Sequence, residues 1–447
     1  MESALRPQTL LTEKPSAHLD SNGSTTILTK VNAFIDRNVW WLFILLVLVG
    51  LFIRFYRIDE AVRFGWDQAR DAWAVRNIVL GKGTLIGPRA GGQFDLGPAY
   101  FYFLIPFFLL TRLDPSALNY FNFLANIINF VIIFLATRKI FSSKGALFVT
   151  FIYAINSYLV RINQTPWNVT LVPGVAVLVF FSLYKIYEKE FRWFFVLAAT
   201  SGFFFHLHFT AVFIPLIIIA SLIFVKEKWQ ALKYALASLP LFLLWLIPNA
   251  VYEIQKHANA YQVPEFLKYY YIGFHWRFFL FRLGDGIIQF ATIVNFPDNI
   301  FVKLLIPVAF LFVIFFWEKQ WKWRLFAYLI SLWFVIPLIG FTLYGGPISE
   351  YYFLASAPMV LYVLAYLHMK LTRLKFLPVY ILIFAYWTVY TYQNTKNFWT
   401  RPMDKGLAAQ KQDVRALIKR GEKKEFGEGV IESYLYTIWT QDTKNKK

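Results

Sequence analysis

The chain has 447 residues, of which 58% are hydrophobic and 20% aromatic, and its mean hydropathy is +0.48. This composition excludes an ordinary soluble globular protein and indicates a polytopic membrane protein. The formal charge of +19 does not point to nucleic acid, because the basic residues lie in short clusters between apolar runs, as in loops that face anionic lipid. Because the chain has no cysteine, neither a disulfide nor a thiolate ligand is available to it.

Residues 1–38 are polar and mixed in charge, and they precede the first apolar run. This arrangement does not resemble a cleavable signal peptide, in which a short apolar run follows a basic end. We therefore expect a cytoplasmic amino-terminal segment, a retained anchor at Val39–Ile53 and one membrane domain over residues 39–392.

The apolar runs of the chain approach the length that crosses a hydrocarbon core of about 30 Å. They are Val39–Ile53, Ala117–Ala136, Ala146–Val160, Thr170–Tyr184, Phe209–Val225, Ala235–Val251, Val302–Phe316, Leu325–Leu343, Phe353–Leu367 and Phe376–Val389, with shorter candidates at Ala99–Leu110 and Phe191–Phe205. The sequence thus predicts an all-α polytopic membrane protein with about ten to thirteen membrane segments.

Basic connectors recur with two apolar runs between each and the next, which places them together in the cytoplasm by the positive-inside rule. They are Thr137–Lys144, Lys185–Arg192, Lys226–Lys233, Glu318–Arg324 and His368–Lys375. The other connectors then face outward, and so does the short tail over residues 393–447, which has a helical stretch near Leu407–Arg420. The outward connectors include Ile58–Pro98, Arg161–Asn168, His206–His208, Glu253–Asn299 and Tyr344–Tyr352. An even number of crossings before Thr137 requires that Ala99–Leu110 is short, tilted or re-entrant, or that these runs divide differently.

The outward loop Ile58–Pro98 concentrates carboxylates, arginines and glycines in an otherwise apolar chain. Its arginines run against the positive-inside rule, so they hold either an anionic substrate or ordinary lipid phosphates. The stretch from Asp67 to Leu80 has helical spacing and ends at Gly81, which suits a carboxyl-terminal cap. We expect this helix to lie on the membrane with Trp73 at the interface.

Two carboxylates of this loop are candidates for chemistry. Asp67, at the start of the helix, either caps it or acts as a general base, with Arg70 beside it to hold a phosphate. Asp95 either pairs with an arginine of the same loop or helps Asp67 to bind an acceptor or a metal.

Further motifs follow on the predicted outer side. They are Leu96-Gly97-Pro98-Ala99-Tyr100-Phe101-Tyr102, Trp167-Asn168 with Pro173, Gly202-Phe203-Phe204-Phe205-His206-Leu207-His208-Phe209-Thr210-Ala211, and Glu350-Tyr351-Tyr352-Phe353 with Pro358. Together with Asp67, they resemble the motifs of the GT-C glycosyltransferases, of the bacterial protein mannosyltransferase and aminoarabinose transferase type. The match departs from the family at Leu96, where a lysine is common, and at Gly97, Gln68 and Val169. Without that lysine, Arg70, Arg76 or Arg161 would hold the phosphate.

The resemblance implies a GT-C fold and transfer of a sugar from a polyprenyl phosphate to an extracytoplasmic lipid, glycan or protein, in the cytoplasmic membrane of a bacterium. It implies that Asp67 is the catalytic base and that inversion occurs at the anomeric carbon. The expected substrate-binding residues are Arg70, Asp95, Arg76, Trp167, Asn168, His206, His208, Glu350 and Tyr351. No cofactor is certain, although a divalent metal stays open.

Alternatives remain for several of these features. His206 and His208 form either a zinc pair or polar packing, and they lack the i, i+4 spacing of a helical metal site. Glu350 is either part of the site or a solvated turn. A transporter or lipid flippase is the rival function, although no matching halves are evident in the sequence. The aromatic loop Glu253–Asn299 is expected to roof the site with amphipathic helices.

Overall fold

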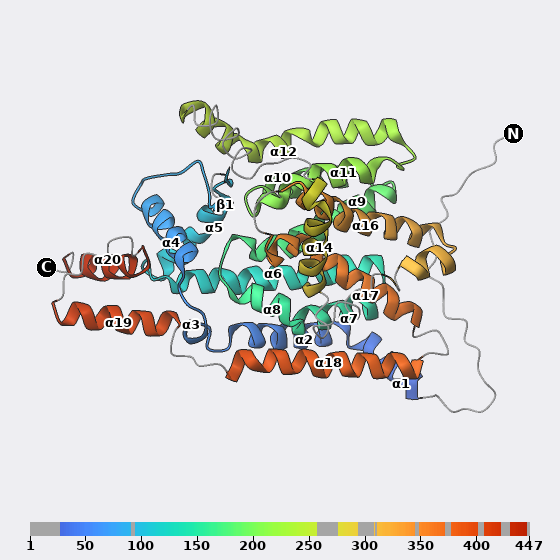
Figure 1. Ribbon diagram of the computed structural model, residues 1–447, viewed down its shortest axis with the longest axis horizontal. Helices are drawn as coiled ribbons and strands as arrows, with labels where there is room; N and C mark the ends of the chain where they lie inside the picture. Colours follow the sequence, from blue (N-terminus) through green and yellow to red (C-terminus); the bar gives the residue numbers. More distant parts are fainter. Residues whose placement is uncertain are drawn as a thin grey trace.

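The computed structural model describes residues 27–90, 94–256, 276–293, 308, 311–344, 348–371, 377–400, 406–421 and 430–444. Within them the chain is almost entirely helical, apart from one short hairpin (Figure 1). The helices of the amino-terminal half are α1 (Ile27–Arg37), α2 (Val39–Phe55), α3 (Ile58–Ala61), α4 (Trp66–Val79), α5 (Ala99–Leu110), α6 (Ser116–Ile140), α7 (Ser143–Ile155), α8 (Ser157–Gln164), η1 (Asn168–Leu171), α9 (Val172–Tyr187), α10 (Trp193–Phe204), η2 (Phe209–Val212) and α11 (Phe213–Leu222).

The carboxyl-terminal half continues the helical pattern. Its elements are α12 (Lys228–Lys256), α14 (Trp276–Ile293), η3 (Val313–Trp317), α16 (Trp321–Thr342), η4 (Glu350–Ser356), α17 (Ala357–Leu371), α18 (Leu377–Thr400), α19 (Leu407–Lys419) and α20 (Val430–Lys444). The hairpin pairs β1 (Arg89–Ala90) with β2 (Phe94–Asp95) in antiparallel register.

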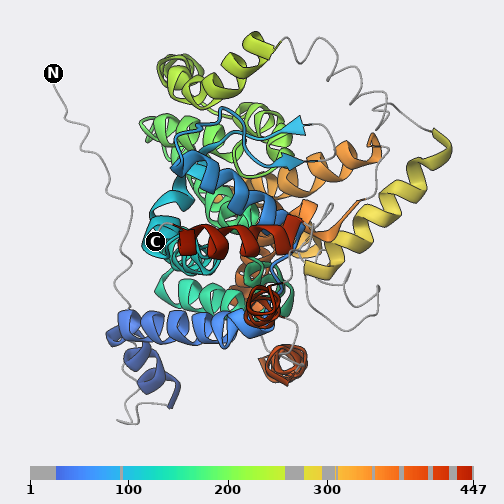
Figure 2. The ribbon, with the colours of Figure 1, turned by 90° about the vertical axis from the view of Figure 1, so that its left-hand side faces the viewer.

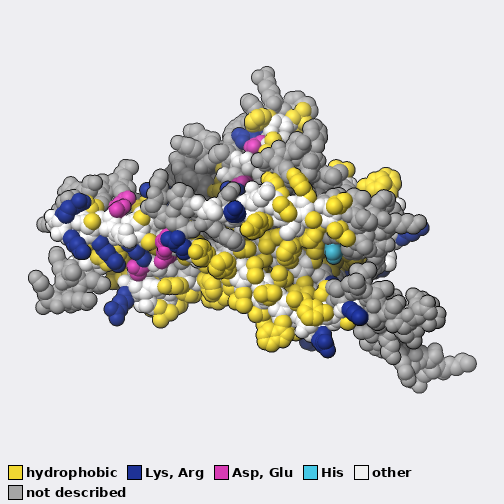
Figure 3. All heavy atoms as spheres, turned by 90° about the horizontal axis from the view of Figure 1, so that it is seen from below, with side chains coloured by type: hydrophobic (Ala, Val, Ile, Leu, Met, Phe, Trp, Pro, Cys, Tyr) yellow, Lys and Arg dark blue, Asp and Glu magenta, His cyan; other side chains and the backbone are white. Residues whose placement is uncertain are grey.

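Six helical stretches of the described residues are long and apolar enough to cross a membrane. They are Val39–Ala61, Ser116–Ile140, Asn168–Tyr187, Lys228–Gln255, Trp321–Thr342 and Glu350–Lys370. Hydrophobic side chains cover the middle of the face drawn in Figure 3, whereas charged side chains gather toward one end. The predicted all-α membrane class is confirmed, and the total of ten to thirteen segments stays a prediction.

Residues on either side of the short helix α5 contact the first loop or the carboxyl-terminal helix α20. Leu96, three residues before its start, accepts a hydrogen bond at its carbonyl from the Gly87 amide at 2.7 Å. Just after its end, the Leu113 carbonyl accepts a hydrogen bond from Tyr434 of α20, and α20 packs on α4. At 12 residues, α5 is shorter than the candidate membrane spans, and the number of crossings before Thr137 stays a prediction.

The apolar run Ala146–Val160 is divided between two helices, which form either a broken span or a re-entrant piece. α7 and α8 meet at Asn156 with a bend of 61°. The Asn156 side chain accepts a hydrogen bond from the Leu159 amide at 3.0 Å, so it caps a new helix at this point. The outward connector expected from Arg161 accordingly begins inside α8.

The amphipathic roof expected over Glu253–Asn299 is described in part. Residues 257–275 and 294–299, which include the predicted Tyr269-Tyr270-Tyr271 cluster, lie outside the described residues. The described helix α14 packs on α16 and η4. Its role as a roof stays a prediction.

The predicted orientation is testable because the chain lacks cysteine. Lys82 in the first loop and Lys139 at the end of α6 are both exposed. A membrane-impermeant thiol reagent added to intact cells should label Lys82→Cys and not Lys139→Cys, while permeabilised cells should show both labelled. Labelling of Lys139→Cys alone in intact cells would show that the predicted orientation is reversed.

Candidate active site

The start of α4 is fixed by Gln68 instead of Asp67. The side-chain Oε1 of Gln68 accepts a hydrogen bond from the Gly65 backbone amide at 3.1 Å, and its Nε2 donates to the Pro166 backbone carbonyl at 3.2 Å. Gln68 therefore closes the first turn of α4 and joins it to the segment that carries Trp167. The predicted end of the helix is observed as well, since Gly81 has φ +87°. Asp67 is thus free of the capping role that was its alternative.

Arg70 lies between two carboxylates. Its Nη1 donates to Asp67 Oδ1 at 2.7 Å, and its Nη2 and Nε donate to Asp71 Oδ1 at 2.7 and 2.9 Å. The guanidinium carbon is also 5.5 Å from the Trp66 ring centroid. The Asp67 side chain is 51% exposed, whereas that of Asp71 is fully buried. One arginine thus orients an accessible carboxylate while it neutralises a buried one.

Sequence reasoning did not select Asp71 as a site residue. Burial raises its pKa to about 7, against the opposing effect of the Arg70 charge and hydrogen bonds. Its Oδ2 and the nearby Tyr100 hydroxyl are both buried without a hydrogen-bond partner. Although burial lowers the pKa of Arg70, the two carboxylates outweigh it and the pKa rises. The available signal was the i, i+4 spacing of Asp67 and Asp71 around Arg70.

Trp167, Tyr351 and His208 form an aromatic wall next to this pair. The centroid of the Tyr351 ring lies 5.1 Å from that of Trp167 and 5.7 Å from that of His208. The Asp67 carboxylate lies within electrostatic range of the Tyr351 hydroxyl. The Trp167 indole nitrogen is buried without a partner. Segments predicted on the outer side therefore do meet around Asp67.

The end of the first loop forms a second polar corner. Asp95 pairs with Arg89 at 3.1 Å, across the register of the β1–β2 hairpin. The Asp95 side chain is only 4% exposed, and its Oδ2 has no hydrogen-bond partner. Asn249 of α12 donates to the Asp95 carbonyl at 3.0 Å. Of the two alternatives for Asp95, the structure therefore shows the first, an ion pair with an arginine of the same loop.

His206 holds the start of α5 against α12. Its Nδ1 accepts from the Ala99 amide at 3.1 Å, so Nε2 carries the proton and donates to the Trp245 carbonyl at 2.7 Å. Burial lowers the pKa of His206, which favours this neutral form. Because both ring nitrogens are engaged, the geometry favours polar packing over the zinc pair. His208 pairs with the Thr210 hydroxyl at 2.8 Å, and burial lowers its pKa to about 3.

Gly97 has no room for a side chain at this corner. A Cβ there would lie 2.2 Å from the His206 ring. We expect Gly97→Ala to reduce thermal stability by about 1–3 kcal/mol through overpacking, and to reduce turnover by displacing the start of α5. Gly284→Ala is the matched control, because nothing lies within 4 Å of its Cβ position. Equal melting temperatures for the two variants would contradict the close packing.

The remaining predicted residues are more dispersed. Asn168 donates to the Leu207 carbonyl and so joins the aromatic wall to the His206 corner. Glu350 forms an ion pair with Arg161. Glu350 therefore does more than line a solvated turn, and Arg161 already has a carboxylate partner. Arg76 stacks on Trp73 with its guanidinium carbon 5.4 Å from the ring. No group of three His, Asp or Glu side chains suited to a metal occurs among the described residues.

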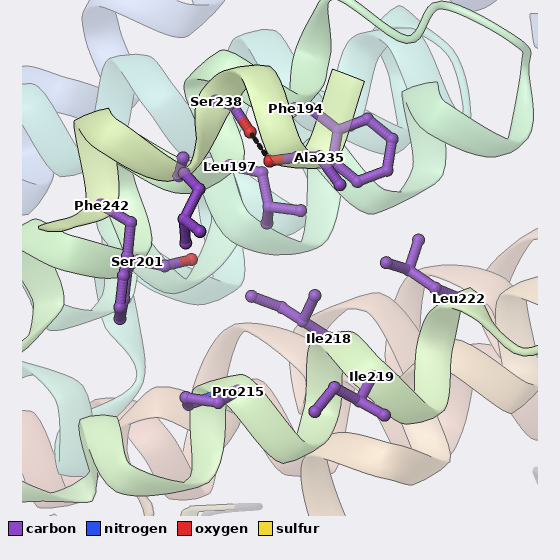
Figure 4. Close-up of a pocket in the computed structure, with 12 residues that line it drawn as sticks. Phe194, Leu197, Ser201, Pro215, Ile218, Ile219, Leu222, Ala235, Ser238 and Phe242 are labelled. Atoms are coloured by element: carbon purple, nitrogen blue, oxygen red, sulfur yellow. Dashed lines mark hydrogen bonds between the residues drawn. The ribbon is translucent and has the colours of Figure 1, made fainter. Parts of the chain in front are cut away.

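An apolar pocket of about 210 Å³ lies between α10, α11 and α12 (Figure 4). Its lining includes Leu197, Ile218 and Phe242, and the only hydroxyls on it belong to Ser201 and Ser238. None of the candidate charged residues faces it. The pocket is therefore separate from the chemistry of the first loop.

Two solved structures illustrate what the chain is similar to. ArnT from Cupriavidus metallidurans bound to undecaprenyl phosphate is 14% identical, with a TM-score of 0.51 over 88% of this chain and 74% of that one. The apo form of the Archaeoglobus fulgidus oligosaccharyltransferase is 14% identical, with a TM-score of 0.52 over 90% of this chain and 60% of that one. These similarities show that the chain shares the fold of these two proteins, the GT-C fold.

Residues 95–252 match the family described as dolichyl-phosphate-mannose-protein mannosyltransferase. No curated protein sequence matches the chain. The resemblance to GT-C glycosyltransferases of the mannosyltransferase and aminoarabinose transferase type is therefore confirmed by a family match and by the fold.

Proposed function

We propose that this protein is an integral-membrane glycosyltransferase that moves a sugar from a polyprenyl-phosphate donor to an extracytoplasmic lipid, glycan or protein. The observation that carries the proposal is the half-exposed Asp67 carboxylate, held by Arg70 at the start of a helix that Gln68 joins to the segment carrying Trp167. The family match and the fold shared with a structure bound to undecaprenyl phosphate support the donor class. The proposed location is the cytoplasmic membrane of a bacterium, with the site on its outer face.

In the proposed reaction, Asp67 accepts the proton of an acceptor hydroxyl or amine. The acceptor atom forms a bond to the anomeric carbon while the bond from that carbon to the phosphate oxygen breaks, with inversion. The bonding electrons leave with the polyprenyl phosphate, whose negative charge is stabilised by Arg70. Since the phosphate is a good leaving group, the reaction requires no nucleotide.

The other residues supply binding in this proposal. Trp167, Asn168 and Tyr351 present an aromatic and polar surface suited to a sugar ring or the lipid phosphate. His206 and Asp95 shape the corner from which α5 begins. Arg76 and Glu350 lie toward the margins of the site.

The direct test uses purified protein in lipid vesicles with a polyprenyl-phosphate sugar labelled in the sugar. Release of free polyprenyl phosphate together with a labelled acceptor is the expected result, and cell-surface glycans should change in cells that lack the gene. Movement of the intact labelled lipid across the membrane, without cleavage, would instead establish a flippase.

A further inference from the structure

The carboxyl-terminal helices pack on the first loop, although more than 300 residues separate them in sequence. Figure 1 shows α19 and α20 at the same end of the molecule as α3 and α4, and Figure 2 shows α20 lying beside α4. α20 packs on α4 and α19 packs on α3. The sequence predicted only a short outward tail, with Trp73 against the membrane. The Trp73 ring lies 5.3 Å from the Tyr434 ring of α20, so part of the face of α4 is covered by protein, and the place of Trp73 at the membrane interface stays a prediction.

Gln410 of α19 forms two hydrogen bonds to the backbone just before α4. Its Nε2 donates to the Phe64 carbonyl at 3.0 Å, and its Oε1 accepts from the Phe64 amide at 2.9 Å. Phe64 directly precedes Gly65, the N-cap residue of α4. A single amide side chain thus replaces the pairing that a neighbouring strand would give this irregular segment.

The beginning of α19 fits the same segment closely. The Leu407 amide donates to the Val62 carbonyl at 3.0 Å. A Cβ at Gly406 would lie 2.2 Å from the Glu60 carbonyl oxygen, so the two backbones touch. These contacts bring Gln410 to a fixed position opposite Phe64.

Tyr434 extends the contact to the rest of the loop. It is fully buried, its ring lies 5.9 Å from that of Phe64, and its hydroxyl donates to the Leu113 carbonyl at 2.8 Å. Arg415 stacks on Trp439 at 4.8 Å and so joins α19 to α20. The two helices therefore form one unit that spans from the start of α4 to the end of α5.

We propose that Gln410 is a positioning residue of the transfer reaction, which fixes the Phe64 backbone and thereby the placement of Asp67 at the start of α4. This inference rests on the proposed function of Asp67. Displacement of a catalytic group by about 1 Å can lower a rate about 100-fold, so a hydrogen-bond pair three residues away bears directly on turnover. Gln410 has no hydrogen bond to Asp67 or Arg70. In this proposal it acts only through the backbone from Phe64 to Asp67.

The test compares Gln410→Leu, which loses both hydrogen bonds, with Gln410→Glu, which keeps only the acceptor. Lys411→Met is the matched control on the same helix, because Lys411 binds Asp114 and Ser116 at 2.6 and 2.7 Å and makes no contact with Phe64. Each variant is assayed as the full chain in lipid vesicles. Amide hydrogen exchange over residues 58–68 is measured in parallel, as a readout independent of activity.

We expect Gln410→Leu to lower kcat about 10- to 100-fold, with the KM for the lipid-linked sugar within about 2-fold of wild type. Amide exchange over residues 58–68 should become faster. Gln410→Glu should fall between Gln410→Leu and wild type in both readouts, whereas Lys411→Met should keep the wild-type kcat and the wild-type exchange of this segment.

Two results would overturn the inference. One is unchanged exchange in Gln410→Leu, which would show that Gln410 does not fix the loop. The other is faster exchange with an unchanged kcat, which would show that the fixed backbone does not matter for turnover. Failure of the proposed function is separate, since it appears as full activity in Asp67→Asn while the exchange data still decide whether Gln410 fixes the segment.

Discussion

Replacing Asp67 with asparagine should lower turnover by roughly 10² to 10⁴ while donor binding stays near the wild-type value. Asparagine preserves the shape and the oxygen that accepts from Arg70 Nη1, but it removes the group that takes the acceptor proton. The effect should therefore appear in kcat. It is measured with purified protein in lipid vesicles, together with the affinity for the lipid-linked sugar.

Glu60→Gln is a suitable control for this change. Glu60 is also a partly exposed carboxylate of the first loop that pairs with an arginine, Arg57, but it lies in α3. We expect this variant to turn over at the wild-type rate, since surface ion pairs contribute little. A wild-type rate for Asp67→Asn would place the base elsewhere, with Asp95 as the leading candidate.

Local signals in the sequence predicted much of the first loop. The helical spacing from Asp67 and the turn at Gly81 depend on neighbouring residues only, so they could be read directly. The same holds for the helical stretch at Leu407, where α19 begins. Local pattern also suggested the pairing of Asp95 within its own loop, although not its partner.

The rest depended on contacts between distant parts of the chain. The burial of Asp71 follows from the packing of α4 on α5, and no property of residue 71 alone reveals it. Trp73 was predicted at the membrane interface because it lies on an amphipathic helix next to a membrane span. An aromatic residue in that place suits a contact with protein equally well. Its contact with Tyr434 comes from a distant part of the chain, so no local pattern reveals it. Similarly, Asn156 lies in an apolar run whose hydropathy is compatible with one straight helix, and its cap is a matter of geometry.

Arg70 offers the second large effect, and its variants should separate binding from stability. In Arg70→Ala, the donor phosphate loses a charge-assisted partner worth about 1.5–3 kcal/mol, so we expect the KM for the donor to rise about 10- to 100-fold. The same change leaves Asp71 buried without a counterion, which should destabilise the protein at pH values above the folded pKa of Asp71. A single substitution therefore changes both quantities.

The double variant Arg70→Ala/Asp71→Asn distinguishes the two causes. Removing the buried charge should restore the melting temperature toward the wild-type value, while the raised KM should persist because the phosphate partner is still missing. The pH dependence provides an independent check. The pKa of Asp71 lies near 7 in the folded wild-type protein, above its ordinary value of 3.8, and loss of Arg70 raises it further.

For a carboxyl group whose folded pKa is raised, ionisation opposes folding. The cost is absent below about pH 4, where the carboxyl is protonated in both states, and it grows as the pH rises toward and through the folded pKa. The stability defect of Arg70→Ala should therefore be larger at pH 8 than at pH 5, and the double variant should lack this difference. A defect in Arg70→Ala that is independent of pH and persists in the double variant would mean that Asp71 is not the source of the instability. A KM restored by Asp71→Asn would mean that Arg70 does not bind the donor phosphate.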